Sequence, residues 1–408
     1  MKGIQLHAVA LVLGALLSAW HAAGETQFAT LYEFPSGDAP AGLTAAGGVL
    51  YGVGEGPGCG AVFEMLPPGQ DGGEWTQTVL YAFTGDSGDA CGPNGLTAAP
   101  TGALFGMSTG GGASLFGAVF ELRPPAMAGG TWTETVLCSF SGGSDGGDPF
   151  GNVVVGPDGA LYGATTEGGA HGYGNVFKLQ PPATLGGTRN YTPLYGFAGG
   201  SDAAIPVSLT MGLHGVLYGT SEMGGSSKFS AGTIFRLEPP AGPDGDWTET
   251  VLYSFQSDED GSSPYSPVAA AKDGSIFGTT FGTLFVGSYP GPKGVGSVFR
   301  LTPPSSAGGT WTKTILQQFG EGNGCGPDSP LTLRDGTIYG MTCLGAGGPV
   351  FELQPPAATG GAWTRTVLHQ FTNGQQPNGS FVMNESGAIF GSTFGVHQVP
   401  GTVYEVAP

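Results

Sequence analysis

Short runs of alternating apolar and polar residues, separated by turn residues, follow one another along almost the whole chain. Four such runs make one unit. In the sixth unit they span 330–333, 337–342, 350–353 and 363–371. Asp335-Gly336 joins the first two runs, and this dipeptide is typical of tight β-hairpins. Apolar residues nowhere recur at helical spacing for long enough to form a helix. The pattern predicts an all-β chain built from four-stranded units.

The unit recurs seven times, on average about every 56 residues between Tyr51 and Phe390. An aromatic–Gly pair marks each copy: Tyr51-Gly52, Phe105-Gly106, Tyr162-Gly163, Tyr218-Gly219, Phe277-Gly278, Tyr339-Gly340 and Phe390-Gly391. A quartet such as Val176-Phe177-Lys178-Leu179 follows each pair. A segment of the form WTxTVLxxF then ends on a phenylalanine, at Phe34, Phe83, Phe140, Phe197, Phe255, Phe319 and Phe371.

Seven units of four strands indicate a seven-bladed β-propeller. The short first run of each unit, with its small side chains, is expected to be the innermost strand, and WTxTVLxxF the outer edge. Pro-Pro pairs after the third run end that strand, because proline has no N–H to donate. The glycine after each aromatic residue is expected to let a neighbouring ring approach the backbone. An open solenoid is the alternative arrangement.

The two ends of the repeat region are complementary. Residues 28–34 form a fourth-strand element that has no blade of its own, and residues 402–406 form a third-strand element without a successor. Pairing them predicts a ring closed by the N-terminal strand and three C-terminal strands. Closure removes exposed sheet edges, which a solenoid would retain.

Residues 1–24 are expected to be a signal peptide. A basic start at Lys2 precedes an apolar run at 8–19 and small residues at 22–24, and the run is too short to span a bilayer. An uncleaved anchor is the weaker alternative. Residues 25–408 then form one propeller domain, soluble after cleavage and either secreted or periplasmic, and a monomer is expected.

The composition narrows the class of partner. The chain contains 79 Gly and 32 Pro, yet 39% of its residues are hydrophobic, which suffices for a large core. Its formal net charge is −19. Nucleic acids and anionic lipids require basic patches, so neither is an expected partner.

The third unit combines Phe140-Ser-Gly-Gly-Ser-Asp-Gly146, Asp158-Gly-Ala-Leu-Tyr-Gly-Ala-Thr-Thr166 and Asn175-Val-Phe-Lys-Leu179. It resembles the tandem repeat of the GloVer-type (choice-of-anchor) exported bacterial proteins, over essentially the whole mature chain. The resemblance implies export and supplies no catalytic residue that can be placed here. Members often end in an envelope-anchoring tail. This sequence ends at Pro408 without one, so release is expected, although envelope association stays open.

Aspartates are concentrated in the loops that link the blades. Asp145, Asp148, Asp258 and Asp260 are candidate Ca²⁺ ligands, because several carboxylates could converge near one channel mouth. The alternative is that each carboxylate stabilises its own turn. Residue 269, the twelfth position from Asp258, is Ala where an EF-hand requires a glutamate, so an EF-hand is excluded. Apart from Ca²⁺, no metal or cofactor is expected.

Five cysteines in an exported chain suggest disulfides. Cys325 precedes the first strand of its blade and Cys343 ends the second, which predicts a pair. Cys59 precedes a third strand and Cys91 follows the fourth strand of the same blade, which predicts another. Cys138 takes a position that is tyrosine in other units and is expected to be a free, buried thiol.

Residues 280–296 form the longest and least repeat-like loop, and its Phe281, Phe285, Tyr289 and Lys293 are candidate ligand-binding residues. The leading hypothesis is an exported module that binds a carbohydrate or another component of the cell envelope. A polysaccharide hydrolase or lyase with its site in the acidic loops is the second hypothesis. A structural spacer, which would have no pocket, is the third.

Overall fold

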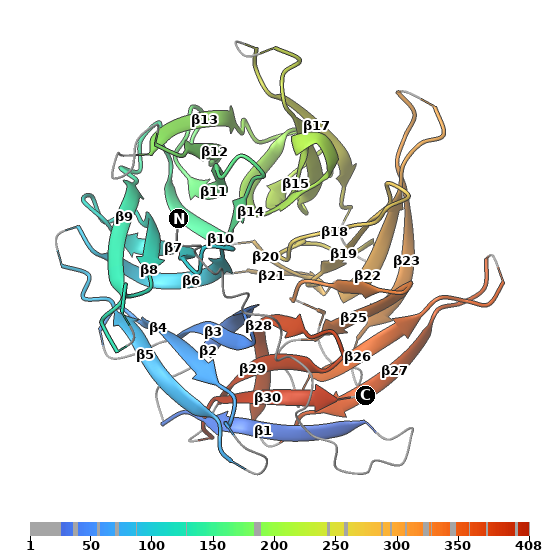
Figure 1. Cartoon of the computed structure of the whole chain (residues 1–408). Helices are drawn as coiled ribbons and strands as arrows, with labels where there is room; N and C mark the ends of the chain where they lie inside the picture. The colour runs from blue at the N-terminus through green and yellow to red at the C-terminus, as the bar shows by residue number, and fades with distance from the viewer. Residues whose placement is uncertain are drawn as a thin grey trace, which may run out of the picture.

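Seven four-stranded antiparallel sheets form a closed ring in the computed structural model (Figure 1). It describes residues 26–407, with gaps at 36–39, 55–57, 70–72, 87, 128, 183–188, 243–244, 257–259, 287–288, 294–295, 307, 321–325, 328, 343–347, 359, 373 and 396–398. The predicted signal peptide lies outside the described residues. They include the 3₁₀ turn η1 (Leu213–Gly215), and they form no helix with the length and hydrophobicity of a membrane span.

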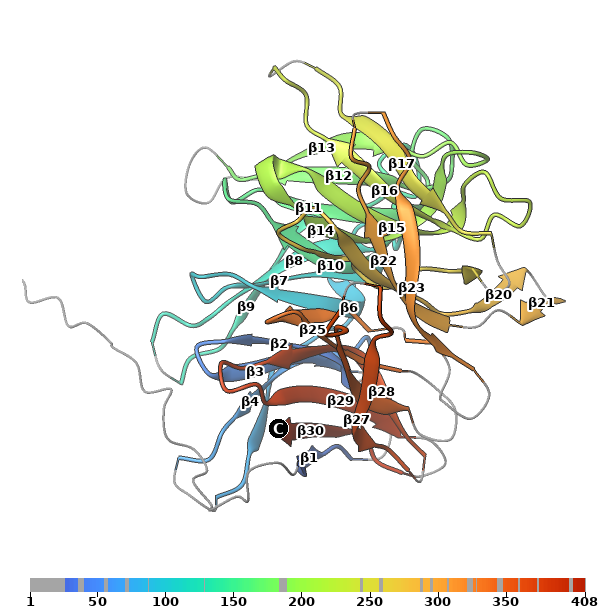
Figure 2. The same cartoon turned by 90° about the vertical axis from the view of Figure 1, so that its right-hand side faces the viewer.

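Each blade contains four strands that follow one another outward from the axis (Figures 1 and 2). Blade 1 consists of β2 (Pro40–Ala46), β3 (Val49–Gly54), β4 (Ala61–Leu66) and β5 (Thr76–Ala82). Blade 2 consists of β6 (Ala90–Ala98), β7 (Leu104–Gly111), β8 (Ala118–Arg123) and β9 (Thr133–Ser139). Blade 3 consists of β10 (Gly147–Val155), β11 (Leu161–Glu167), β12 (Asn175–Gln180) and β13 (Asn190–Gly196). Blade 4 consists of β14 (Ala203–Met211), β15 (Leu217–Gly224), β16 (Thr233–Glu238) and β17 (Thr248–Ser254). Blade 5 consists of β18 (Ala269–Ala270), β19 (Ile276–Thr280), β22 (Gly296–Thr302) and β23 (Thr312–Phe319). Blade 6 consists of β24 (Thr332–Arg334), β25 (Thr337–Met341), β26 (Pro349–Gln354) and β27 (Thr364–Gln370).

The seventh blade closes the ring as predicted. It consists of β28 (Gln375–Met383), β29 (Ile389–Gly395), β30 (Thr402–Ala407) and the N-terminal β1 (Gln27–Glu33). β1 runs antiparallel to β30, with Phe28 opposite Val406. An extra hairpin of β20 (Thr283–Val286) and β21 (Tyr289–Lys293) belongs to no blade.

The core lies between neighbouring blades and depends on the repeated aromatic residues. Each closing phenylalanine is at most 5% exposed. It packs against the third-strand ring of the next blade, with centroids 4.9–5.4 Å apart: Phe34–Phe63, Phe83–Phe120, Phe140–Phe177, Phe197–Phe235, Phe255–Phe299, Phe319–Phe351 and Phe371–Tyr404.

The glycine of each aromatic–Gly pair accommodates that same third-strand ring. In blade 4, Gly219 pairs with Phe235 across the sheet. A Cβ on Gly219 would lie 2.1 Å from the tip of the Phe235 ring. The glycine is therefore required by packing, and the expectation that it admits a neighbouring ring is confirmed.

Candidate ligand-binding site at the ring axis

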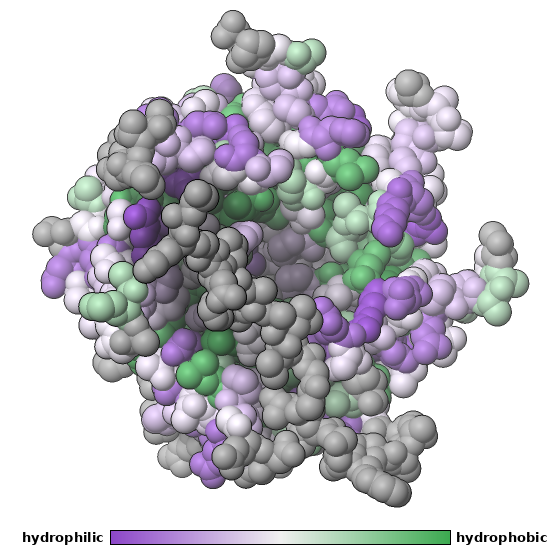
Figure 3. Space-filling view, in the orientation of Figure 1, coloured by the Kyte–Doolittle hydropathy of each residue, from purple (hydrophilic) through white to green (hydrophobic). Residues whose placement is uncertain are grey.

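The inner strands surround a cavity of about 740 Å³, here called the axial cavity. Figure 3 shows that the ring is also hollowed near its centre on the face opposite the β20–β21 hairpin. The described residues that line the axial cavity are Ala41–Leu43, Gly54, Gly58–Gly60, Cys91–Leu96, Thr109, Phe150–Asn152, Val207, Ser208, Tyr265–Pro267, Pro330 and Asn378–Ser380. Blades 1 to 7 all contribute, mainly through their first strands or the residues that lead into them.

A repeated Pro-x-Gly/Ser motif shapes these first strands. In blade 2 it reads Pro93-Asn94-Gly95, and the register of β6 against β7 shifts at this point. A Cβ on Gly95 would lie 1.9 Å from Oδ1 of Asn152 in the next blade. Small residues here let the inner strands converge on the axis, while the residue after each proline is free to vary.

Side-chain amides and hydroxyls join the inner strands to one another. The Nδ2 of Asn94 donates to the carbonyl of Pro149 at 2.9 Å, and the Nδ2 of Asn378 donates to the carbonyl of Pro40 at 3.2 Å. Ser380 Oγ donates to the carbonyl of Leu43 at 3.0 Å. The Oδ1 of Asn94 is buried and accepts no hydrogen bond.

Two aromatic residues from different blades meet at the axial cavity. The rings of Phe150 and Tyr265 lie edge to face with centroids 5.9 Å apart, and Tyr265 is 37% exposed. The Tyr265 hydroxyl donates to Glu222 Oε2 at 3.3 Å. Burial, with the nearby Glu222 carboxylate, raises the pKa of Tyr265 to about 12, so the hydroxyl keeps its proton. Burial also raises the pKa of Glu222.

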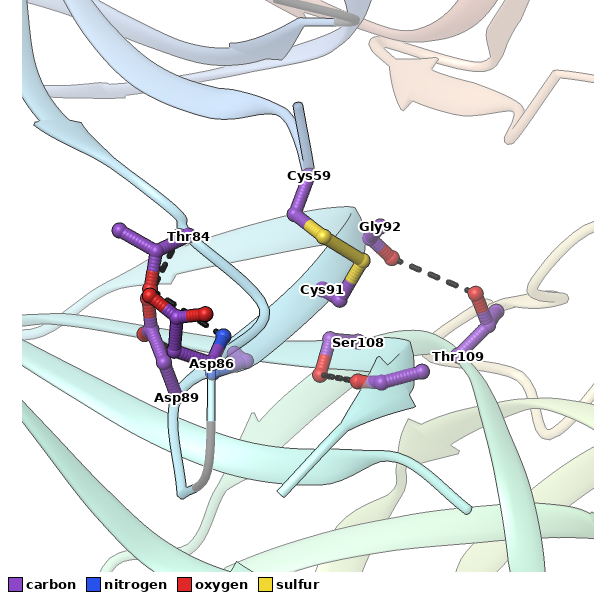
Figure 4. Close-up of a disulfide and its surroundings, with 10 residues drawn as sticks. Cys59, Thr84, Asp86, Asp89, Cys91, Gly92, Ser108 and Thr109 are labelled. Carbon is purple, nitrogen blue, oxygen red and sulfur yellow. Dashed lines mark hydrogen bonds between the residues drawn. A yellow bond between two sulfur atoms is a disulfide. The ribbon is translucent and has the colours of Figure 1, made fainter. Parts of the chain in front are cut away.

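A disulfide between Cys59 and Cys91 lies in the wall of the axial cavity (Figure 4). It confirms the second predicted pair and joins the β3–β4 connection of blade 1 to the first strand of blade 2. The first predicted pair, Cys325 and Cys343, lies outside the described residues. Cys138 is free, as predicted, and is half-buried.

The described aspartates of the linking loops hold their own loops in shape. Asp145 accepts hydrogen bonds from the backbone N–H and the hydroxyl of Ser141. Asp260 accepts from the backbone N–H of Gln256 at 2.7 Å and from the Tyr253 hydroxyl at 2.7 Å. These contacts match the turn-stabilising alternative.

Of the two remaining candidate Ca²⁺ ligands, only Asp148 is described. Asp148 Oδ2 accepts from Thr166 Oγ1 at 3.1 Å, and Asp258 lies outside the described residues. In the described part of the chain, no three His, Cys, Asp or Glu residues gather as a metal site would require. The calcium hypothesis stays a prediction.

The four candidate ligand-binding residues of 280–296 lie in or beside the β20–β21 hairpin. Phe281 precedes it and is half-buried. The backbone of Phe285 pairs with Pro290, Tyr289 pairs with Val286, and Lys293 pairs with Thr283. The hairpin projects from one face of the ring beside the axis (Figures 1 and 2). This placement brings its backbone near the axis.

Sequence reasoning overlooked the residues that line the axial cavity. Asn94, Phe150 and Tyr265 each follow the proline of a first-strand motif. The motif itself recurs, but its middle residue differs from unit to unit: Ala41, Asn94, Phe150, Val207, Tyr265, Asp328 and Asn378. These cavity-lining residues could have been found from the sequence, because they occupy the one position of the repeated motif that varies.

Comparisons with known proteins identify the repeat and the fold. A family model described as the Gloeobacter/Verrucomicrobia repeat matches residues 126–285 and 231–408. The chain matches no curated protein in sequence.

Several solved structures share the architecture. A PL25 ulvan lyase bound to -[GlcA(1-4)Rha3S]- aligns with a TM-score of 0.58 and 12% identity, covering 91% of this chain and 94% of that one. The polysaccharide lyase Uly1 aligns with a TM-score of 0.51 and 9% identity, covering 90% of each chain. An aldose sugar dehydrogenase from Streptomyces coelicolor has a TM-score of 0.46 and 14% identity, covering 77% of this chain and 93% of that one. At these identities the likeness concerns the fold alone.

Proposed function

Because the chain belongs to the Gloeobacter/Verrucomicrobia repeat family and closes its blades into one ring, we propose that it is an exported carbohydrate-binding module. Its binding site is the axial cavity. The observation that carries this proposal is the lining of that cavity, where Phe150 and Tyr265 stand among side-chain amides and hydroxyls.

This lining suits the chemistry of a sugar. The C–H face of a pyranose ring packs against an aromatic ring, and its hydroxyls exchange hydrogen bonds with amides and hydroxyls. The Tyr265 hydroxyl donates to Glu222 Oε2, and its oxygen keeps lone pairs that can accept a hydrogen bond from a sugar hydroxyl. One lyase of the same fold is bound to a glycan, the acidic -[GlcA(1-4)Rha3S]-, at 12% identity to this chain.

Binding is favoured over turnover and over a spacer role. Among the described lining residues, only Tyr265 titrates, since Cys59 and Cys91 are bonded to each other. Its pKa of about 12 is far from the working range of a general base at neutral pH. A structural spacer needs no cavity, whereas this ring encloses one of about 740 Å³.

Export accords with two features of the chain. Disulfides persist in oxidising compartments, and Cys59 is bonded to Cys91. The predicted signal peptide at 1–24 points the same way. The proposal is therefore a secreted or periplasmic monomer that meets its glycan outside the cytoplasm.

A glycan array followed by calorimetric titration tests the proposal. We expect Tyr265→Ala and Phe150→Ala each to weaken binding of the best glycan by about tenfold, because each removes a stacking surface. Tyr173→Ala is the matched control, since Tyr173 is 47% exposed and lies outside the cavity lining. Titration in EDTA measures the contribution of Ca²⁺. Absence of binding to every glycan, or release of new reducing ends, would contradict the proposal.

A further inference from the structure

A carboxylate without a basic partner among the described residues contacts Tyr265, which lines the axial cavity. Glu222 is on β15 of blade 4, and its Oε2 accepts from the hydroxyl of Tyr265, which leads into blade 5. Asp148, at the start of blade 3, also raises the pKa of Tyr265 through its charge. Glu222 therefore contacts the Tyr265 hydroxyl, and the charge of Asp148 also acts on it.

Basic side chains accompany other acids of this chain but are missing here. Lys178 pairs with Asp158 at 3.0 Å, Arg300 with Asp273 at 2.6 Å, and Lys313 with Asp260 at 2.8 Å. Within the described residues, neither Glu222 nor Asp148 has such a partner. The described lining of the axial cavity also contains no Lys, Arg or His. Within the described residues, the site beside Tyr265 thus carries negative charge without a basic partner.

We propose that the axial cavity selects uncharged glycans against acidic ones, and that Glu222 is the residue that sets this selectivity. The inference rests on the proposed function. A neutral sugar can donate hydroxyl hydrogen bonds to the Glu222 carboxylate, and such charge-assisted bonds are strong. A uronate or sulfate group at the same place meets like charge in a partly desolvated cavity. Selectivity then follows from one attractive and one repulsive interaction at a single side chain.

The test compares matched pairs of hexasaccharides that differ only at C6. Gluco-, galacto- and manno-hexaoses are titrated beside their glucuronate, galacturonate and mannuronate counterparts. In any pair that the wild-type chain binds, we expect the neutral hexasaccharide to bind at least about tenfold more tightly than its uronate counterpart. Glu222→Gln keeps the shape of the side chain and removes its charge. In this variant, the ratio between the two dissociation constants should fall by about threefold or more.

A control separates the local charge from the net charge of −19. Glu74→Gln removes the same charge at an exposed position in the β4–β5 connection, and it should leave the affinity ratio unchanged. The proposed selectivity is wrong if the uronates bind as tightly as the neutral glycans or more tightly. It is also wrong if Glu74→Gln changes the affinity ratio as much as Glu222→Gln does. Either result leaves the proposed glycan-binding function standing. Failure of every hexasaccharide and every arrayed glycan to bind overturns the proposed function as well. Thermal unfolding of each variant confirms that it is folded.

Discussion

Equivalent positions under the linking loops carry opposite charges in different units. In blade 5, Lys313 is 4% exposed, and its ammonium bonds Asp260 and lies 4.8 Å from the centroid of Phe255. In blade 4, the matching position of the outer strand is Glu249, beside Asp202. Burial and the Asp202 charge raise the pKa of Glu249 to about 8, and its Oε1 has no hydrogen-bond partner. One unit supplies a cation where another unit holds a second acid.

This contrast predicts the pH dependence of stability. The folded chain keeps a proton on Glu249 that the unfolded chain releases above the ordinary value of 4.5. The contribution of Glu249 to the free energy of unfolding is therefore fully present below pH 4.5 and is lost as the pH rises towards about 8. Glu249→Lys, which copies the Lys313 arrangement, should raise the unfolding temperature at pH 8 by about 1–3 °C and weaken this decline.

Scanning calorimetry between pH 5 and pH 8 measures the effect. Glu249→Gln serves as the control, because it removes the titrating group without adding a cation. A lysine variant that unfolds at a lower temperature than the glutamine variant at pH 8 would show that the two units are not equivalent.

At the level of elements, one position in the connection between second and third strands is filled in two ways. In blade 1 it is Cys59, whose Sγ would lie 2.3 Å from a Cβ on Gly85. In blade 2 it is Phe116, whose ring covers Gly142, and in blade 3 it is Tyr173, which lies over Gly199. The disulfide therefore occupies the place of an aromatic contact between blades.

Removing this disulfide should destabilise the ring. The bond joins residues 32 positions apart, and closing such a loop is worth about 3–4 kcal/mol on the chain-entropy model. We expect Cys59→Ser with Cys91→Ser to lose an amount of this order in urea unfolding, whereas Cys138→Ser should change little. Combining Cys59→Phe with Cys91→Gly copies the next unit and should recover part of the loss. A serine pair as stable as the wild type would mean that the disulfide does not hold the blades together.

At the scale of the whole molecule, stability depends on a single strand contributed from the other end of the chain. β1 completes the seventh blade, and its Phe28 stacks on His369 at 3.7 Å between ring centroids. Phe34, immediately after β1, packs on Phe63 of blade 1. The N-terminal strand thus contributes both to the sheet of the last blade and to the core between blades 7 and 1.

Deletion of residues 26–34 should open the ring. The edge of β30 would lose its partner, and an unpaired edge strand recruits other chains. We expect a lower unfolding temperature and oligomers in light scattering after size exclusion. Replacing the β20–β21 hairpin by a short Gly-Ser turn is the control, because that hairpin belongs to no blade. A monomer of unchanged stability after deletion of β1 would disprove the closure argument.

The repeat by itself determined the number of blades, the order of strands within each blade and the way the ring closes. These features follow from local patterns, such as the aromatic–Gly pairs, Asp335-Gly336 and the complementary ends 28–34 and 402–406. The Cys59–Cys91 pair was also predictable, because both residues flank strands whose places in the blade were known.

Only the tertiary structure decided where a ligand can bind. Phe150 and Tyr265 are more than a hundred residues apart and come from blades that are not adjacent in the ring, yet their rings touch at the axis. Glu222 approaches them from the blade between. Strand patterns describe contacts within a unit and between neighbouring units, whereas the axial cavity depends on how seven inner strands converge. That convergence places variable residues from separate units around one space, and no single repeat encodes it.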